Sequence, residues 1–242
     1  MFLTVLGRNG PYPRPGGACS GYYIEDGPTR VLVDCGSGVL SRLMEYVRPE
    51  HLDAVVLSHM HFDHCSDLFV MRYALDQQDV REGEEKRRVP LFTPAEPFDT
   101  LNAITTGALF SHRTVKGGDE IQIGTLRFQF LPMAHPVPTN GMRITGADGA
   151  VLFFTGDTKP FPGMEAGAMG ANALLADACF VDASQTGPHM NVKEACALAR
   201  NAGVRTLYLT HLWGKRDTEE AMKKEIDFPS AVVVKERVRY CI

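Results

Sequence analysis

The sequence predicts an α/β fold for this chain of 242 residues. Short apolar runs of strand length alternate with segments whose apolar residues recur at helical spacing, as expected when helices cover a sheet. Gly- and Pro-rich stretches between them are typical of turns. No linker, low-complexity tract or short-period repeat divides the chain, so we expect one domain over residues 1–242.

The N-terminal half is predicted to begin with strands and to continue with helices. In chain order we expect strands at Phe2–Leu6, Tyr22–Ile24 and Arg30–Asp34, a helix over 39–47, a buried strand at Ala54–Leu57 and a helix over Leu68–Leu75. The mixed charge run 79–88 is predicted to be a solvated loop.

The C-terminal half repeats this order. We expect strands at Glu120–Ile123, Leu126–Leu131, Gly141–Thr145, Val151–Thr155, Thr206–Leu209 and Ala231–Val234, a loop or short helix over 163–170, and a helix over Thr218–Ile226. The clearest helix starts at Asn191, a good N-cap, with Glu194 placed to complete a capping box and Gly203 suited to the left-handed position after the last turn.

Composition excludes several classes of protein. With 44% hydrophobic and 22% charged residues, the chain is neither disordered nor a coiled coil nor collagen-like. A net charge of −4 argues against a wholly basic nucleic-acid surface. No apolar run approaches the roughly 20 residues of a membrane helix, and the N-terminus lacks the features of a signal peptide. Six scattered cysteines without a Cys-x-x-Cys pair fit reduced thiols, so we expect a cytoplasmic protein.

The stretch 58–64, Ser-His-Met-His-Phe-Asp-His, carries the strongest chemical signal. On extended or looping backbone, His59 and His61 point the same way and can bind one metal ion. Asp63 and His64, further along the loop, would face a second ion. Imidazole and carboxylate ligands suit zinc, and also manganese or iron. The alternative, that these residues cap the following helix with Asp63 or Ser66, needs one such side chain and not three histidines.

Three more polar residues follow apolar runs where functional loops of a layered fold gather. His135 follows the strand that ends at Leu131, Asp157 follows Val151–Thr155, and His211 follows Thr206–Leu209. Each alone is equally compatible with a packed histidine or a turn aspartate. Their recurrence beside the His-rich stretch makes them candidate ligands.

These motifs resemble the metallo-β-lactamase superfamily over nearly the whole chain. The residues that carry the resemblance are Asp34-Cys35-Gly36, the stretch 58–64, His135, Thr155-Gly156-Asp157-Thr158 and Leu209-Thr210-His211. The resemblance implies a four-layer αββα sandwich with a two-metal site at one edge. It implies that His59, His61 and His135 bind one ion, that Asp63, His64 and His211 bind the other, and that Asp157 bridges them. Asp34 and Asp67 would accept hydrogen bonds from ligand rings, unless they only cap turns.

Within the superfamily the C-terminal half is similar to the branch of tRNase Z and related phosphodiesterases. The matching residues are His189-Met190-Asn191, Lys193-Glu194-Ala195, Ala202-Gly203-Val204 and Leu209-Thr210-His211. By that resemblance His189 would protonate the leaving group, with Asp182 as its orienting carboxylate where the family usually has glutamate. The alternative is a surface histidine that only caps the helix.

The chain departs from tRNase Z in its substrate-binding segments. The loop 10–17 offers a single arginine, and no long basic arm follows Asp157. We therefore expect a small-molecule or short phosphodiester substrate in preference to tRNA, and no membrane partner; a homodimer stays open.

Three hypotheses follow for function. The first is a dinuclear phosphodiesterase with two divalent ions, zinc first among them, a metal-bridging hydroxide as nucleophile, Asp63 in the catalytic centre and His189 as general acid. The second keeps the site but changes the substrate to a lactone, thioester or other carbonyl ester, and tRNA 3′-processing is a further variant of the first. The third is a binding module without turnover. Arg143 and Lys159 are candidate phosphate contacts or solvated cations, and Trp213 is a candidate for the pocket wall or for simple packing.

Overall fold

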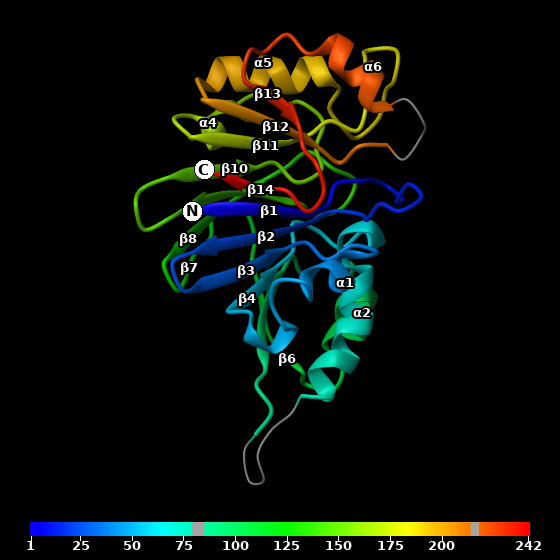
Figure 1. Ribbon diagram of the computed structural model, residues 1–242, viewed down its shortest axis with the longest axis vertical. Helices are drawn as coiled ribbons and strands as arrows, with labels where there is room; N and C mark the ends of the chain where they lie inside the picture. The colour runs from blue at the N-terminus through cyan, green and yellow to red at the C-terminus, as the bar shows by residue number, and fades with distance from the viewer. Residues whose placement is uncertain (79–84, 214–217) are drawn as a thin grey trace.

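The computed structural model describes residues 1–78, 85–213 and 218–242 (Figure 1). Two seven-stranded sheets stack face to face, and helices cover the outer face of each. This is the αββα sandwich, so the expected fold class is confirmed. Part of the predicted loop over 79–88 lies outside the described residues.

The first sheet has the strand order β14-β1-β2-β3-β4-β5-β6. Strands β1 to β3 are antiparallel, and β3 to β6 run parallel to one another. Its strands are β1 Phe2–Gly7, β2 Gly21–Asp26, β3 Thr29–Val33, β4 Ala54–Val56, β5 Val89–Thr93, β6 Phe110–Thr114 and β14 Arg239–Cys241. The helices of this half are α1 Val39–Leu43, the 3₁₀ helix η1 Pro49–His51, α2 Phe62–Asp76 and α3 Phe98–Thr105.

The second sheet has the order β13-β12-β11-β10-β9-β8-β7. Strands β7 to β10 are antiparallel, and β10 to β13 are parallel. Its strands are β7 Glu120–Ile123, β8 Leu126–Pro132, β9 Asn140–Thr145, β10 Val151–Phe154, β11 Ala173–Asp177, β12 Thr206–Thr210 and β13 Ala231–Val233. Helices α4 Glu165–Ala168, α5 Val192–Ala202 and α6 Thr218–Glu225 belong to this half.

Strands buried on both faces produce three apolar layers. In β3, Val31 and Val33 face the second sheet, while Leu32 between them packs under the helices of its own half. In β10, Leu152 faces the first sheet and Phe153 packs with α4 and α5. Because side chains alternate between the faces of a strand, such near-continuous apolar runs are what a doubly covered sheet requires.

The predicted helices differ from the observed ones mainly at their ends. The helix expected over 39–47 ends at Leu43, and the one expected over Leu68–Leu75 begins at Phe62. The helix after Asn191 has the full capping box, and Gly203 adopts the left-handed conformation at φ 66° as predicted. Strands β5, β6, β11 and β14 and helices η1 and α3 were not among the predicted elements.

Candidate metal centre and active site

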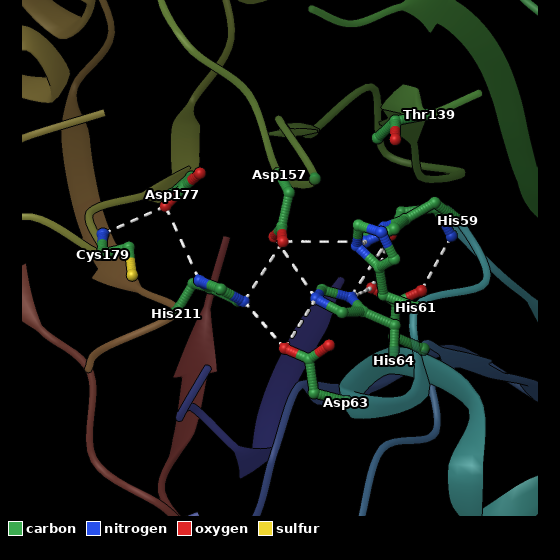
Figure 2. A network of polar contacts seen from close by, with 12 residues as sticks. His59, His61, Asp63, His64, Thr139, Asp157, Asp177, Cys179 and His211 are labelled. Carbon is green, nitrogen blue, oxygen red and sulfur yellow. Dashed lines mark hydrogen bonds and ion pairs between the residues drawn. The ribbon is translucent and has the colours of Figure 1, made fainter. Parts of the chain in front are cut away.

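The ends of strands from both sheets supply the site. Asp34 follows β3, and His59 follows β4, in the first sheet; Asp157 follows β10, Asp177 ends β11, and His211 follows β12, in the second. Carboxyl ends of parallel strands meet at one edge of a sheet, where ligands of α/β proteins bind. Figure 2 shows the side chains converging between the two halves.

The His-rich stretch divides between a strand end and a helix. Its second histidine, His61, is the N-cap residue of α2 with extended backbone, φ −64° and ψ 149°. His59 and His61 therefore precede the helix, whereas Asp63 and His64 lie in its first turn and not on a loop as expected. A carboxylate in the first turn of a helix is stabilised by the helix dipole, so Asp63 is well placed as an anion.

Three imidazoles form the first group of candidate ligands. Nδ1 of His61 lies 3.0 Å from Nε2 of His59 and 3.1 Å from Nε2 of His135. Oδ2 of Asp157 lies 3.7 Å from the same nitrogen of His59 and 3.9 Å from that of His135. A neutral imidazole has one nitrogen with a free lone pair, so such convergence is favourable when a cation lies among the nitrogens.

The second group shares Asp157 with the first. Nε2 of His211 lies 3.2 Å from Oδ2 of Asp63 and 3.2 Å from Oδ2 of Asp157. Nε2 of His64 lies 3.3 Å from Oδ1 of Asp157, and as a buried nitrogen it has no hydrogen-bond partner of good geometry among the described residues.

These observations fit a pair of metal ions. In each group of four, one ligand atom per residue lies within 4.8 Å of all the others. The structure thus brings together all seven predicted ligands, three imidazoles on one side of Asp157 and two imidazoles with a carboxylate on the other. Each group offers four nitrogen and oxygen donors, which suits the tetrahedral coordination of zinc. Manganese and iron also accept this donor set.

The pKa shifts agree with a site built to hold positive charge. Burial and the neighbouring His64 keep the pKa of His59 well below its usual range, so His59 is neutral and free to bind a metal. Burial also opposes the charged forms of His64 and Asp157. Even so, the charges of Asp157, Asp63 and Asp34 raise the pKa of His64 well above its usual range. The charges of His211 and His64 hold the pKa of Asp157 well below its own.

Asp34 fixes one ligand ring from behind. Its Oδ2 lies 2.8 Å from Nδ1 of His64 and accepts a hydrogen bond from the Ser58 hydroxyl at 2.8 Å. Its Oδ1 accepts from the Ser58 backbone N–H at 2.7 Å. A carboxylate behind a ligating imidazole sets the tautomer that presents the other nitrogen to the metal. Asp67, expected in the same role, instead accepts from the backbone N–H of Leu40 at 2.9 Å and orients no ligand ring.

The carboxylate that holds His189 is Asp177, and the expectation of Asp182 was wrong. Oδ2 of Asp177 lies 2.8 Å from Nδ1 of His189. Backbone N–H groups of Thr158 and Cys179 donate to the two oxygens of Asp177 at 3.0 Å each and fix its orientation. Asp182 instead accepts from the backbone and hydroxyl of Ser184 in its own turn.

A sequence signal for Asp177 was present. The apolar run 173–176 ends on this aspartate just as Val151–Thr155 leads to Asp157.

The ring of His189 stacks on that of His211, with centroids 5.0 Å apart and planes at 21°. His189 therefore borders the second metal group directly.

The remaining candidates separate clearly. The guanidinium of Arg143 donates to the carbonyls of Gly167 and Met169 at 2.9 and 3.0 Å, so Arg143 braces the α4 region and was wrongly considered for phosphate binding. Lys159 borders two cavities beside the site. The ring of Trp213 packs near Phe180, with centroids 6.3 Å apart.

Comparison with known proteins identifies the family. The model of the β-lactamase superfamily domain matches residues 29–212. The chain belongs to the metallo-β-lactamase superfamily. The probable metallo-hydrolase YhfI of Bacillus subtilis is 34% identical over 215 residues, which cover 88% of this chain and 87% of YhfI. Ribonuclease Z of Methanopyrus kandleri is 27% identical over 275 residues and covers 98% of this chain and 96% of its own length.

Solved structures of this superfamily share the fold. The crystal structure of YhfI superposes with a TM-score of 0.89 at 30% identity and covers 99% of this chain and 98% of its own. A diphosphatase of the PhnP family superposes with a TM-score of 0.79 at 18% identity, covering 99% and 96%. The superfamily match together with the similarity to metallo-hydrolase YhfI and to ribonuclease Z makes this chain a metal-dependent hydrolase of the tRNase Z-like branch. Among the described residues, no helix combines the length and apolar character needed to cross a membrane.

Proposed function

We propose that this protein is a dinuclear metal-dependent phosphodiesterase in which His189 is the general acid. The observation that carries the proposal is the Asp177–His189 pair, whose histidine stacks on His211, a candidate ligand of the second ion. Asp157 belongs to both groups of candidate ligands. Zinc is the first candidate metal.

The chain's residues fit two ions, with His59, His61 and His135 on one, Asp63, His64 and His211 on the other, and Asp157 between them. Two bound ions lower the pKa of water and neutralise the charge that develops on a phosphoryl group.

His189 contributes the proton that a poor leaving group needs. Asp177 engages Nδ1 and thereby leaves Nε2 as the nitrogen available to the substrate. General-acid catalysis contributes roughly 10²–10⁴ in rate. A phosphodiester with an alkoxide leaving group requires this proton, which is why the pair supports phosphodiesters over activated carbonyl esters.

The space beside the metals supports a small substrate. A cavity of about 510 Å³ borders His135, and one of about 340 Å³ borders His189. Volumes of roughly 300–1,000 Å³ are typical of small-molecule sites. With a net charge of −4 the chain has no general attraction for RNA, so we propose a small phosphodiester and not tRNA. Six cysteines without a disulfide, five of them buried, support a cytoplasmic location.

The test is hydrolysis of phosphodiesters by protein of measured metal content. Turnover of bis(p-nitrophenyl) phosphate should track about two metal ions per chain and disappear in Asp157→Ala. Failure of the fully loaded protein to cleave any phosphodiester, combined with cleavage of thioesters or lactones, would refute the proposal.

The general acid is tested by comparing leaving groups. Asp177→Asn should lower turnover of an alkyl phosphodiester by roughly 10²-fold or more while affecting a p-nitrophenyl ester far less, since p-nitrophenolate leaves without a proton. Asp182→Asn is the matched control, because the Asp182 carboxylate accepts hydrogen bonds from Ser184 in its own turn and not from His189, and it is expected to keep wild-type turnover. Equal effects of the two variants would remove Asp177 from the mechanism.

A further inference from the structure

Two cavities flank the metal groups, and both border Lys159. The larger borders the metal ligand His135, and Ala134, Pro136 and Pro188 also line it. The smaller borders His189 and none of the seven metal ligands. Lys159 and Gly187 line both. The two spaces therefore differ in what they adjoin, a metal ligand in one case and the general acid in the other.

The position of His189 gives the smaller cavity its role. A general acid must reach the oxygen of the departing group, so whatever follows that oxygen lies on the side of His189. The smaller cavity is lined by His189 and by none of the seven metal ligands, so it lies on the side toward which a leaving group protonated by His189 would extend.

The walls of this cavity offer mainly hydrogen-bond donors. The ammonium of Lys159 has three donors and no acceptor. Gln185 uses its carbonyl oxygen to accept from the backbone of Val181, and Asn191 uses its own to accept from Glu194, which leaves the NH₂ group of each amide as a donor. Glu194 is the one carboxylate of the wall, and it accepts from the backbone N–H of Asn191 as part of the helix cap.

Among the described residues, no carboxylate lies within ion-pair distance of the ammonium of Lys159. Its backbone N–H donates to the carbonyl of Ala134 at 3.2 Å, and its own carbonyl accepts from the Thr158 hydroxyl at 2.8 Å. The backbone of this lysine is thus tied to the loop that carries His135, while its side chain is exposed.

We propose that the cavity beside His189 is a leaving-group subsite and that Lys159 makes it selective for leaving groups that carry an anion. The inference rests on the proposed phosphodiesterase function and names its substrate class, a small phosphodiester whose departing alcohol bears a carboxylate or phosphate. Lys159 is a specificity-determining residue in this arrangement.

Two substrates of equal size and different charge test it. Methyl 4-carboxyphenyl phosphate releases 4-hydroxybenzoate, and methyl 4-carbamoylphenyl phosphate releases the neutral 4-hydroxybenzamide; both leave methyl phosphate. The readout is the ratio of their kcat/KM values, measured with metal-loaded protein. The intrinsic reactivity of each ester cancels when this ratio is compared between variants.

We expect the ratio to fall about fivefold in Lys159→Gln, the size of an ion pair in a partly open site, and to be retained in Lys159→Arg. In the wild type the ratio should also fall with rising ionic strength, because salt screens an exposed charge, whereas in Lys159→Gln it should not change with salt. Lys224→Gln, which removes an exposed lysine of α6, is the control and should behave as wild type.

An unchanged ratio in Lys159→Gln, or an equal loss in Lys224→Gln, would overturn the subsite while leaving the phosphodiesterase function intact. Absence of cleavage of both esters by the wild type would overturn the proposed function itself and the subsite with it. The two failures are therefore distinguishable.

Discussion

Asp34 offers a direct test of how the metal centre is held in place. Asp34 is fully buried and has a left-handed backbone, φ 57°, which asparagine tolerates better than most residues. Asp34→Asn therefore changes the hydrogen bonding with little change in volume or backbone strain. In the wild type, Oδ1 takes the Ser58 N–H and Oδ2 faces Nδ1 of His64.

The effect of the substitution follows from that geometry. If the asparagine oxygen keeps the Ser58 N–H, its NH₂ group faces Nδ1 of His64, and two donors meet. This repulsion is relieved when His64 adopts the tautomer with its proton on Nε2, the nitrogen that lies 3.3 Å from Oδ1 of Asp157 in the second metal group. That proton competes with the metal, so we expect a loss of roughly 10–100-fold in affinity for the second ion.

The assay is competition with a calibrated chelator, read as two separate dissociation constants. Asp67→Asn is the control, because Asp67 also lies behind the His-rich stretch but binds a backbone N–H. Equal affinities in Asp34→Asn and wild type would refute the role of the ring tautomer. A loss of the same size in Asp67→Asn would show that any change to this region loosens the metal.

Two further predictions concern the same centre. In the metal-free protein, burial opposes protonation of His64 and His211, but surrounding carboxylates, Asp157 foremost, raise the pKa of both well above 6.5. Since a metal binds only the neutral rings, metal binding near neutral pH should release protons, and the metal affinity should fall as the pH is lowered. Calorimetry in buffers of different ionisation enthalpy measures the number of protons released. Equal heats of binding in all buffers would contradict this prediction. Gly10→Ala would place a Cβ 1.9 Å from Nε2 of His211, so the imidazole ring must move. We therefore expect the metal content measured by elemental analysis to drop from about two ions per chain to about one. Full metal occupancy of this variant would show that Gly10 is not needed to position His211.

Local patterns in the sequence were sufficient for much of the site. His59, His61, Asp63 and His64 lie within six residues, so their convergence depends on one strand end and one helix turn. The three remaining ligands, His135, Asp157 and His211, each follow a strand that ends at the same edge of the second sheet. All seven predicted ligands therefore lie together in the structure. The start of α2 was missed because its first turn consists of site residues and shows no apolar periodicity before Leu68.

Pairings between distant segments were harder to predict. Both Asp177 and Asp182 precede His189 in the chain, and spacing alone does not tell which one faces it. The strand order decides, since β11 lies between β10 and β12 and directs Asp177 into the site, while Asp182 turns onto its own loop. Strand β6 escaped prediction because its sequence, FSHRT, is mostly polar, with only Phe110 buried.

The pairing of the first and last strands has a consequence for how the chain folds. Strand β14 completes the first sheet by pairing with β1, although more than 200 residues separate them, and Ile242 donates from its backbone N–H to the Met1 carbonyl. During synthesis this edge of β1 therefore stays unpaired until residues 239–241 emerge. Such an open edge is a template for association with other chains. Early release of a chain that lacks 239–241 should thus favour aggregation even though every metal ligand is already present.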